Sequence, residues 1–356
     1  MKTATPQHAY IGSRTTRERN ACGEGITVLR WDETQGSLDP VQVLGDLVNP
    51  SYLAINRRGD TLYTVHGDRS EVSALRVEAA SGQLSLLNQA NCEGRNPVHL
   101  ALDPSERHLI VSNHLSGELA VLDVALDGAL GTVRQRIPLP GEPGPHRKEQ
   151  PHAKPHFNPF DASGRWVLVP DKGLDRVFSF RFEAGQLVPA HQPWVQAREG
   201  AGPRNLVFHP VLPMAYVVNE LDSTLAAYAF DAQDGALCPL QIVPTLPDSF
   251  TGDNRAASIG IDASGSLLFV SNRGHDSVVM FSVDGRTGRL AFERAVPAQG
   301  RTPRFFTLSP GGRWLLVLNE DSNSIQSFAI DRERRDLVPG PQLACGSPVC
   351  LVFGGC

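Results

Sequence analysis

The segment TPRFFTLSPGGRWLLVLNE, residues 302–320, consists of two short apolar stretches joined by a polar turn that contains proline and glycine. Both stretches are rich in leucine, valine and aromatic residues, a composition typical of β-strands. Turn residues between two such stretches reverse the direction of the chain, so the segment predicts a pair of antiparallel strands.

The same pattern occurs five more times along the chain. The other copies are NPSYLAINRRGDTLYTVHG (49–67), NPVHLALDPSERHLIVSNH (96–114), KPHFNPFDASGRWVLVPDK (154–172), GPRNLVFHPVLPMAYVVNE (202–220) and RAASIGIDASGSLLFVSNR (255–273). A third apolar stretch follows each copy, and a turn then leads to a fourth, weaker stretch. The chain is therefore built from repeats of about 47 residues, each of which predicts four antiparallel strands.

A sheet made from one repeat cannot bury both of its faces, so the repeats must stack on one another. Four-stranded units of this length arranged radially form a β-propeller, which leaves only short, protected sheet edges. A seventh unit is divided between the two ends of the chain. SPVCLVFGG (347–355) predicts its first strand, while AYIGSR (9–14) and GITVLRWDE (25–33) predict its second and third strands.

We therefore expect an all-β fold, a seven-bladed β-propeller with four antiparallel strands per blade. Residues 1–356 are expected to form a single domain in which the N- and C-terminal segments close one blade. An α/β fold would need amphipathic helices of ~10 or more residues between the strands, and the sequence shows none.

Charge and composition exclude several classes of partner. The net charge of −5 supplies no basic field for a phosphate backbone, so we expect no nucleic-acid partner. No apolar run approaches the ~18 residues of a membrane span, and Met1–Gln7 lacks the apolar core of a signal peptide. The six cysteines form no C-x-x-C pair, which favours reduced thiols and a cytoplasmic location. The oligomeric state stays open.

Each complete repeat has two positions 15 residues apart, one at the start of its first strand and one at the end of its second. In an antiparallel pair these positions are neighbours, so they all lie on one rim of the disc. The pairs are Ser51/His66, Val98/Asn113, His156/Asp171, Arg204/Asn219, Ala257/Asn272 and Arg304/Asn319. The polar residue at the second position is expected to bond turn backbone. The residue that follows it varies around the ring: Arg14, Gly67, His114, Lys172, Glu220, Arg273 and Glu320.

A propeller directs one rim toward a central channel, so these charged side chains are expected to converge on one mouth. Cations predominate there, and such a mouth attracts an anionic ligand even in a protein of negative net charge. Arginine suits this role because its planar guanidinium matches a carboxylate or a phosphate. Arg204 with Glu220 and Arg304 with Glu320 share one spacing, and each pair also fits an ion pair within a blade. Spacing alone does not show which pair does chemistry.

An insertion before the third repeat, GEPGPHRKEQPHAKPHF (141–157), contains His146, His152 and His156. Two of these histidines are four residues apart, as in helical zinc sites, but Pro151 and Pro155 oppose a helix. We expect no metal here and a polar loop that lines the mouth. No phosphate-binding loop, nucleophile elbow or dinucleotide fingerprint occurs, so we also expect no cofactor.

The blocks GAGPRNLVFHP and AYVVNELDSTL within residues 200–225 resemble the seven-bladed lactonase family. That family includes bacterial 6-phosphogluconolactonases of propeller type and fungal 3-carboxy-cis,cis-muconate lactonising enzymes. The resemblance continues through YIGSRT (10–15), NPSYLAI (49–55), RWVLVPDKGLDRV (165–177), FVSNRGHDSV (269–278) and TPRFFTLSPGGRWLLV (302–317), and it covers essentially the whole chain. Lys154 and Asn205, which stand where many members carry histidine, and the insertion at 141–153 depart from the family pattern.

The resemblance implies a catalytic set of one histidine, two arginines and one glutamate. By motif these are His156, Arg204, Glu220 and Arg273. The resemblance thereby selects the Arg204–Glu220 pair over Arg304–Glu320. The remaining rim residues that are candidates for binding substrate are Lys172, Arg304, His114 and Arg14.

The implied activity is hydrolysis of an anionic sugar lactone, as in a 6-phosphogluconolactonase, without a metal. Either Glu220 or His156 would act as general base, while Arg204 and Arg273 would hold the oxyanion and the anionic tail of the substrate. Lys172 or Arg304 would reach a phosphate. Two alternatives stay open: cycloisomerisation of a muconate by the same residues, and a non-catalytic propeller that binds a protein partner through its rim.

Overall fold

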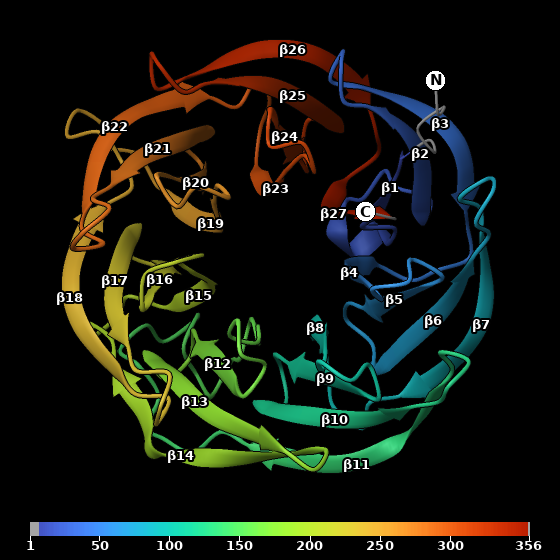
Figure 1. Ribbon diagram of the computed structural model, residues 1–356, viewed down its shortest axis with the longest axis horizontal. Coiled ribbons are helices and arrows are strands. Elements are labelled where there is room, and N and C mark those ends of the chain that lie inside the picture. Colours follow the sequence, from blue (N-terminus) through green and yellow to red (C-terminus); the bar gives the residue numbers. More distant parts are fainter. Residues whose placement is uncertain (1–6, 355–356) are drawn as a thin grey trace.

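Figure 1 shows the computed structural model, which describes residues 7–354 as seven antiparallel β-sheets arranged radially around an axis. The 3₁₀ turn η1 (Arg17–Arg19) is the only helical element in this range, and no helix there has the length and apolar character of a membrane span. The predicted all-β, seven-bladed propeller is therefore confirmed. The described residues do not include residues 1–6, Gly355 and Cys356. Parts of three predictions therefore lie outside them: the absence of a signal peptide, the end of the strand at 347–355 and the thiol of Cys356.

Each blade is one sheet whose strands lie side by side, from an innermost strand near the axis to an outermost strand at the periphery (Figure 1). Blade one contains β4 (Pro50–Ile55), β5 (Thr61–His66), β6 (Glu71–Val77) and β7 (Leu84–Asn91). Blade two contains β8 (Pro97–Leu102), β9 (His108–Asn113), β10 (Glu118–Val124) and β11 (Leu130–Pro138). Blade three contains β12 (Trp166–Asp171), β13 (Arg176–Glu183) and β14 (Gln186–Gln196). Blade four contains β15 (Pro203–Phe208), β16 (Met214–Asn219), β17 (Thr224–Phe230) and β18 (Leu237–Pro244). Blade five contains β19 (Arg255–Ile261), β20 (Leu267–Arg273), β21 (Ser277–Val283) and β22 (Leu290–Pro297). Blade six contains β23 (Pro303–Leu308), β24 (Trp314–Asn319), β25 (Ser324–Asp331) and β26 (Asp336–Ala344). The closing blade contains β27 (Pro348–Gly354), β1 (Gln7–Ser13), β2 (Ile26–Asp32) and β3 (Ser37–Leu44).

The hydrophobic core is divided among the interfaces between neighbouring blades. Between blades one and two, for example, Tyr63 and Val65 belong to the same buried cluster as Leu100 and Val111. Equivalent clusters join the other neighbouring blades around the ring. Stacking of one sheet on the next thus buries the faces that a single repeat leaves exposed.

The closing blade joins the two ends of the chain, as predicted. β27 pairs with β1 in antiparallel register, so that Leu351 lies opposite Ile11, and Figure 1 shows the two strands side by side. Leu351 is fully buried in a cluster that also contains Leu29 and Leu318. The ring is therefore closed by pairing between the first and the last strand.

Leu351→Ala is expected to lower the free energy of unfolding by about 2–4 kcal/mol, because it removes buried apolar atoms and leaves a cavity. The measurement is urea denaturation with a constant m-value. Leu86→Ala, the same change at an exposed position on β7, is the control and is expected to cost less than about 0.5 kcal/mol. A loss below about 1 kcal/mol in L351A would show that closure contributes little to stability.

Blade three departs from the prediction of four full strands per blade. Its sheet has three strands, and residues 155–160 contact β12 through two isolated bridges. Pro155 and Pro159 on one side and Pro170 on the other have no backbone N–H, so a continuous ladder cannot form. The N–H of His156 still donates to the carbonyl of Pro170 at 3.1 Å, which holds this segment in the place of an innermost strand.

The predicted direct pairing of positions 15 residues apart is wrong by one residue. Pro203, rather than Arg204, pairs with Asn219, and the register shifts before Asn205. Arg204 is therefore the extra residue of a β-bulge, a feature that bends a strand and re-aims a side chain. The register shifts at the equivalent place in five other blades, and in four of them the unpaired residues are Ser51, Val98, Arg304 and Val349.

The polar residues at the ends of the second strands have the predicted structural role in several blades. Asp171 accepts hydrogen bonds from three backbone N–H groups, and His66 bonds a backbone carbonyl. Asn272 and Asn319 each donate to a carbonyl in a preceding loop, at 2.6 and 3.0 Å. Asn219 differs, because it donates to a threonine hydroxyl.

Candidate active site

The bulge position of five blades, and the equivalent position of blade three, surround one narrow central cavity. These lining residues are Ser51, Val98, His156, Arg204, Arg304 and Val349. Arg14, Asn205 and three aromatic residues complete the lining. The cavity has a volume of about 30 Å³, enough for a water molecule, so a larger ligand would have to lie across its opening. Rim residues from six blades therefore meet at one place.

Glu220, which directly follows β16, is buried among four cations. Its Oε2 lies 2.9 Å from Nε of Arg204 and 3.2 Å from Nη2 of Arg273. Its Oε1 lies 3.1 Å from Nζ of Lys172 and 3.8 Å from Nη1 of Arg255. Burial alone would raise the pKa of Glu220, but these positive charges hold it well below its ordinary value. Both carboxylate oxygens are occupied, so Glu220 is suited to organising the cations rather than to accepting a proton.

Backbone carbonyls also position the two arginines beside Glu220. Arg204 Nη1 donates to the carbonyl of Ala257, and Arg273 Nη2 donates to the carbonyl of Ala256 at 3.2 Å. Burial lowers the pKa of both guanidinium groups, and the charge of Arg273 lowers that of Arg204 further. An anion bound beside these groups would offset the cost of burying their charge.

His156 lines the cavity, and its buried Nδ1 atom makes no hydrogen bond within residues 7–354. Burial and the charge of Arg204 lower the pKa of His156 well below its ordinary value. The ring of His114 packs edge-on against it, with centroids 5.5 Å apart, and burial together with Lys172 lowers the pKa of His114 to about 3. Both imidazoles are therefore neutral at pH 7, and His156 has an unprotonated ring nitrogen that can accept a proton.

Arg14 and Arg304 reach the same cavity from the closing blade and from blade six. They share Glu320, at 3.9 Å from Arg14 Nε and 3.6 Å from Arg304 Nη1. Burial and the neighbouring Arg304 lower the pKa of Arg14 to about 9, so it remains charged at pH 7. Both arginine–glutamate pairs with the same spacing are thus ion pairs, and the pair formed by Glu220 is the tighter one.

Two charged residues of the site, Glu149 and Arg255, were not predicted. Glu149 belongs to the 141–153 insertion, which does reach the mouth as expected: its Oε2 lies 3.0 Å from Lys172 Nζ and its Oε1 lies 3.3 Å from Arg255 Nη2. Arg255 pairs with Arg273 across β19 and β20, so the repeat pattern could have indicated it, whereas Glu149 has no counterpart in other blades. Lys172, a predicted substrate-binding residue, is already paired with two carboxylates.

The blades of this propeller direct buried cations and a neutral histidine into one cavity, an arrangement whose positive charge suits a small anionic ligand. Residues 8–353 match the family described as lactonase, 7-bladed beta-propeller. The chain therefore belongs to the seven-bladed β-propeller lactonase family, as its sequence motifs implied, and it is an enzyme of the lactone hydrolase class.

Individual relatives cover nearly the whole chain. The chain is 31% identical to the 6-phosphogluconolactonase of Bacillus subtilis, over 97% of this chain and 98% of that protein. It is 30% identical to the 6-phosphogluconolactonase of Formosa agariphila, over 94% of this chain and 95% of that protein. The structure of the periplasmic gluconolactonase of Pseudomonas aeruginosa superposes with a TM-score of 0.90 at 30% identity, and the match covers 98% of this chain and 99% of that chain.

Proposed function

We propose that this protein hydrolyses 6-phosphogluconolactone to the open-chain sugar acid. The observation that carries the proposal is that His156, whose Nδ1 has no hydrogen-bond partner within residues 7–354, and Arg204, which is paired with Glu220, line one narrow cavity. Two relatives named 6-phosphogluconolactonase, similar over nearly the full length, support the substrate class. We also propose a cytoplasmic location, because a phosphorylated sugar carries charge that opposes passage through a bilayer.

In this mechanism His156 accepts a proton from a water molecule as the water oxygen bonds to the lactone carbonyl carbon. The carbonyl oxygen becomes an oxyanion, which the guanidinium groups of Arg204 and Arg273 stabilise. When the intermediate collapses, the bond between the carbonyl carbon and the ring oxygen breaks. The imidazolium of His156 then returns its proton to the leaving ring oxygen. Glu220 keeps the two arginines in position and stays ionised throughout.

The direct test is hydrolysis of freshly prepared 6-phosphogluconolactone by the purified protein, followed by acid release at constant pH. A rate well above the spontaneous rate is expected. The loss of absorbance of 3-carboxymuconate is followed in parallel, because the same residues could serve a cycloisomerase. Activity on the muconate alone, or on neither compound, would contradict the proposal.

Arg204→Ala is expected to lower kcat/KM for the true substrate at least tenfold, because it removes a donor to the oxyanion. Thermal unfolding and circular dichroism would test whether the variant is folded. Arg198→Ala, which removes an exposed arginine bonded to Asp222 outside the cavity, is the matched control and is expected to retain wild-type kinetics. Unchanged kinetics in the R204A variant would remove Arg204 from the site.

A further inference from the structure

Arg14 is buried beside the cavity without a full set of partners. Its residue is 4% exposed, and its Nε and Nη1 atoms make no hydrogen bond within residues 7–354. The nearest carboxylate oxygen to Nε belongs to Glu320 at 3.9 Å, beyond hydrogen-bonding distance. A buried guanidinium with unused donors is costly unless a ligand completes its contacts.

Gly67 makes room for this guanidinium. A Cβ atom at position 67 would lie 2.4 Å from Nη1 of Arg14. All six other blades carry a charged residue or a histidine at the equivalent rim position, as at His114 and Glu220. The absence of a side chain at position 67 therefore leaves a space that Arg14 enters from the neighbouring blade.

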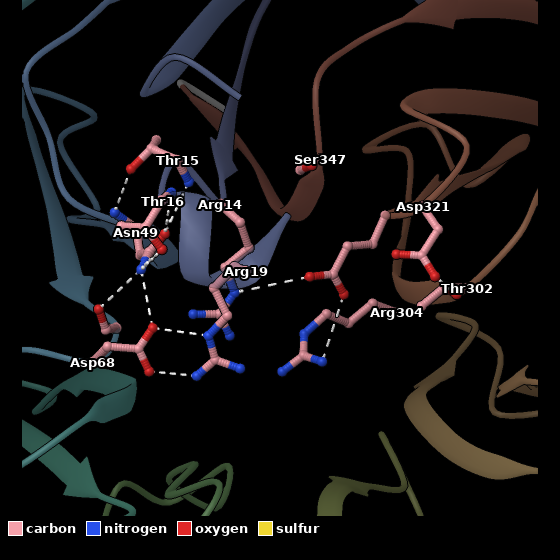
Figure 2. Close-up of polar contacts among 12 residues, drawn as sticks. Arg14, Thr15, Thr16, Arg19, Asn49, Asp68, Thr302, Arg304, Asp321 and Ser347 are labelled. Atoms are coloured by element: carbon pink, nitrogen blue, oxygen red, sulfur yellow. Dashed lines mark hydrogen bonds and ion pairs between the residues drawn. The ribbon is translucent and has the colours of Figure 1, made fainter. Parts of the chain in front are cut away.

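Arg304 faces Arg14 across the carboxylate of Glu320, to which its Nη1 is 3.6 Å away. Arg19 lies next to them in Figure 2, but it is held by Asp68 through Nε at 2.8 Å and a second contact from Nη2. One carboxylate thus serves both Arg14 and Arg304 at long range, whereas Arg19 has a partner of its own. The three arginines therefore outnumber the two carboxylates, Glu320 and Asp68, that lie beside them.

We infer that Arg14 and Arg304 form a subsite for the phosphate of the lactone and so favour the phosphorylated lactone over the unphosphorylated one. The inference rests on the proposed function, because both arginines line the cavity that contains His156 and Arg204. A phosphate monoester carries close to two negative charges at pH 7 and three acceptor oxygens. Two guanidinium groups supply matching charge and planar donor pairs.

The other cations of the mouth are less suited to this role. Lys172 is paired with Glu149 and Glu220 at 3.0 and 3.1 Å, and Arg255 approaches the same two carboxylates. A phosphate at that place would lie beside two carboxylates and be repelled. Beside the Arg14–Arg304 pair it meets Glu320, which two arginines share at long range, and Asp68, which Arg19 already holds.

The test compares kcat/KM for 6-phosphogluconolactone with kcat/KM for unphosphorylated gluconolactone. Arg14→Gln is expected to reduce the preference for the phosphorylated substrate about 30-fold, the effect of losing hydrogen bonds to a charged group. Gly67→Ala keeps every charge but displaces the guanidinium of Arg14, and it is expected to reduce the preference about tenfold. Arg17→Gln removes the same charge from an exposed residue nearby and is expected to leave the ratio within about twofold of wild type.

A preference that changes less than threefold in both R14Q and G67A would overturn the subsite while leaving the lactonase itself intact. If the wild-type protein hydrolyses neither lactone, the proposed function fails, and calorimetry with inorganic phosphate decides on the subsite. Binding that weakens at least tenfold in R14Q supports it. Equal binding by both proteins, or no binding by the wild type, overturns it.

Discussion

His156→Asn is expected to lower kcat for lactone hydrolysis by about 10²- to 10⁴-fold, the usual contribution of a general base. The Nδ1 atom of His156 has no hydrogen-bond partner within residues 7–354, and burial together with the charge of Arg204 keeps the ring neutral. Asparagine fills similar space and cannot accept the proton. Single-turnover kinetics would separate this loss of chemistry from any change in binding.

The pH profile provides a second readout for His156. Because burial and Arg204 lower its pKa well below the ordinary 6.5, the unprotonated base persists at mildly acid pH, and the acid limb of kcat/KM should lie below that value. His191→Asn, on the exposed face of β14, is the matched control and should keep the wild-type rate. A loss smaller than about tenfold in H156N would assign the proton transfer to another group.

Glu220→Gln is expected to lower the free energy of unfolding by about 3–5 kcal/mol, because it leaves buried cations without their carboxylate. We expect it also to lower kcat/KM at least about 100-fold, since Arg204 and Arg273 lose the contacts that position them. Glu320→Gln should have a smaller effect on stability, because its contacts at 3.6 and 3.9 Å are longer. Equal losses in the two variants would contradict the role of Glu220 as organiser.

The effect of Glu220→Gln on stability should depend on pH with a definite sign. The pKa of Glu220 in the folded protein lies well below the ordinary 4.5, because the charges of Arg273, Lys172 and Arg204 outweigh burial. Its contribution is therefore complete above pH 4.5 and is lost as the pH falls through the folded pKa. Urea unfolding at several pH values should show a difference from wild type that shrinks in acid, while Glu199→Gln at an exposed position shows none.

The sequence predicts the ring closely because the repeat appears in six complete copies and the seventh is divided between the chain ends. The sequence does not predict the pairing where a single residue changes the hydrogen-bond pattern of a sheet. The residues around the bulge at Arg204 have no composition that marks a bulge, yet the bulge shifts the strand pairing by one residue. In blade three, Pro155 and Pro170 were visible, but the loss of a full innermost strand depends on their meeting across the sheet.

In the site, too, the residues that belong to the repeat could be predicted, and those outside the repeat could not. The rim pattern and the family motifs identified His156, Arg204 and Arg273 as candidates, and the structure places the first two in one cavity and all three within reach of Glu220 or its partners. Glu149 was not predicted because it belongs to an insertion that has no counterpart in the other blades. The spacing of residues also could not show that His156 is suited to accept a proton while Glu220 is suited to hold the cations, since that distinction depends on which atoms already have partners.

The central claim is that the cations gathered at the mouth of the propeller bind an anionic lactone. Its most direct test is a crystal structure of the protein with 6-phosphogluconate, the hydrolysis product. The expected result is electron density at the mouth, with the carboxylate beside Arg204 and His156 and the phosphate against Arg14 and Arg304. Product bound instead in the separate pocket lined by Phe208 and Ile261, or on the outer surface of the blades, would contradict it.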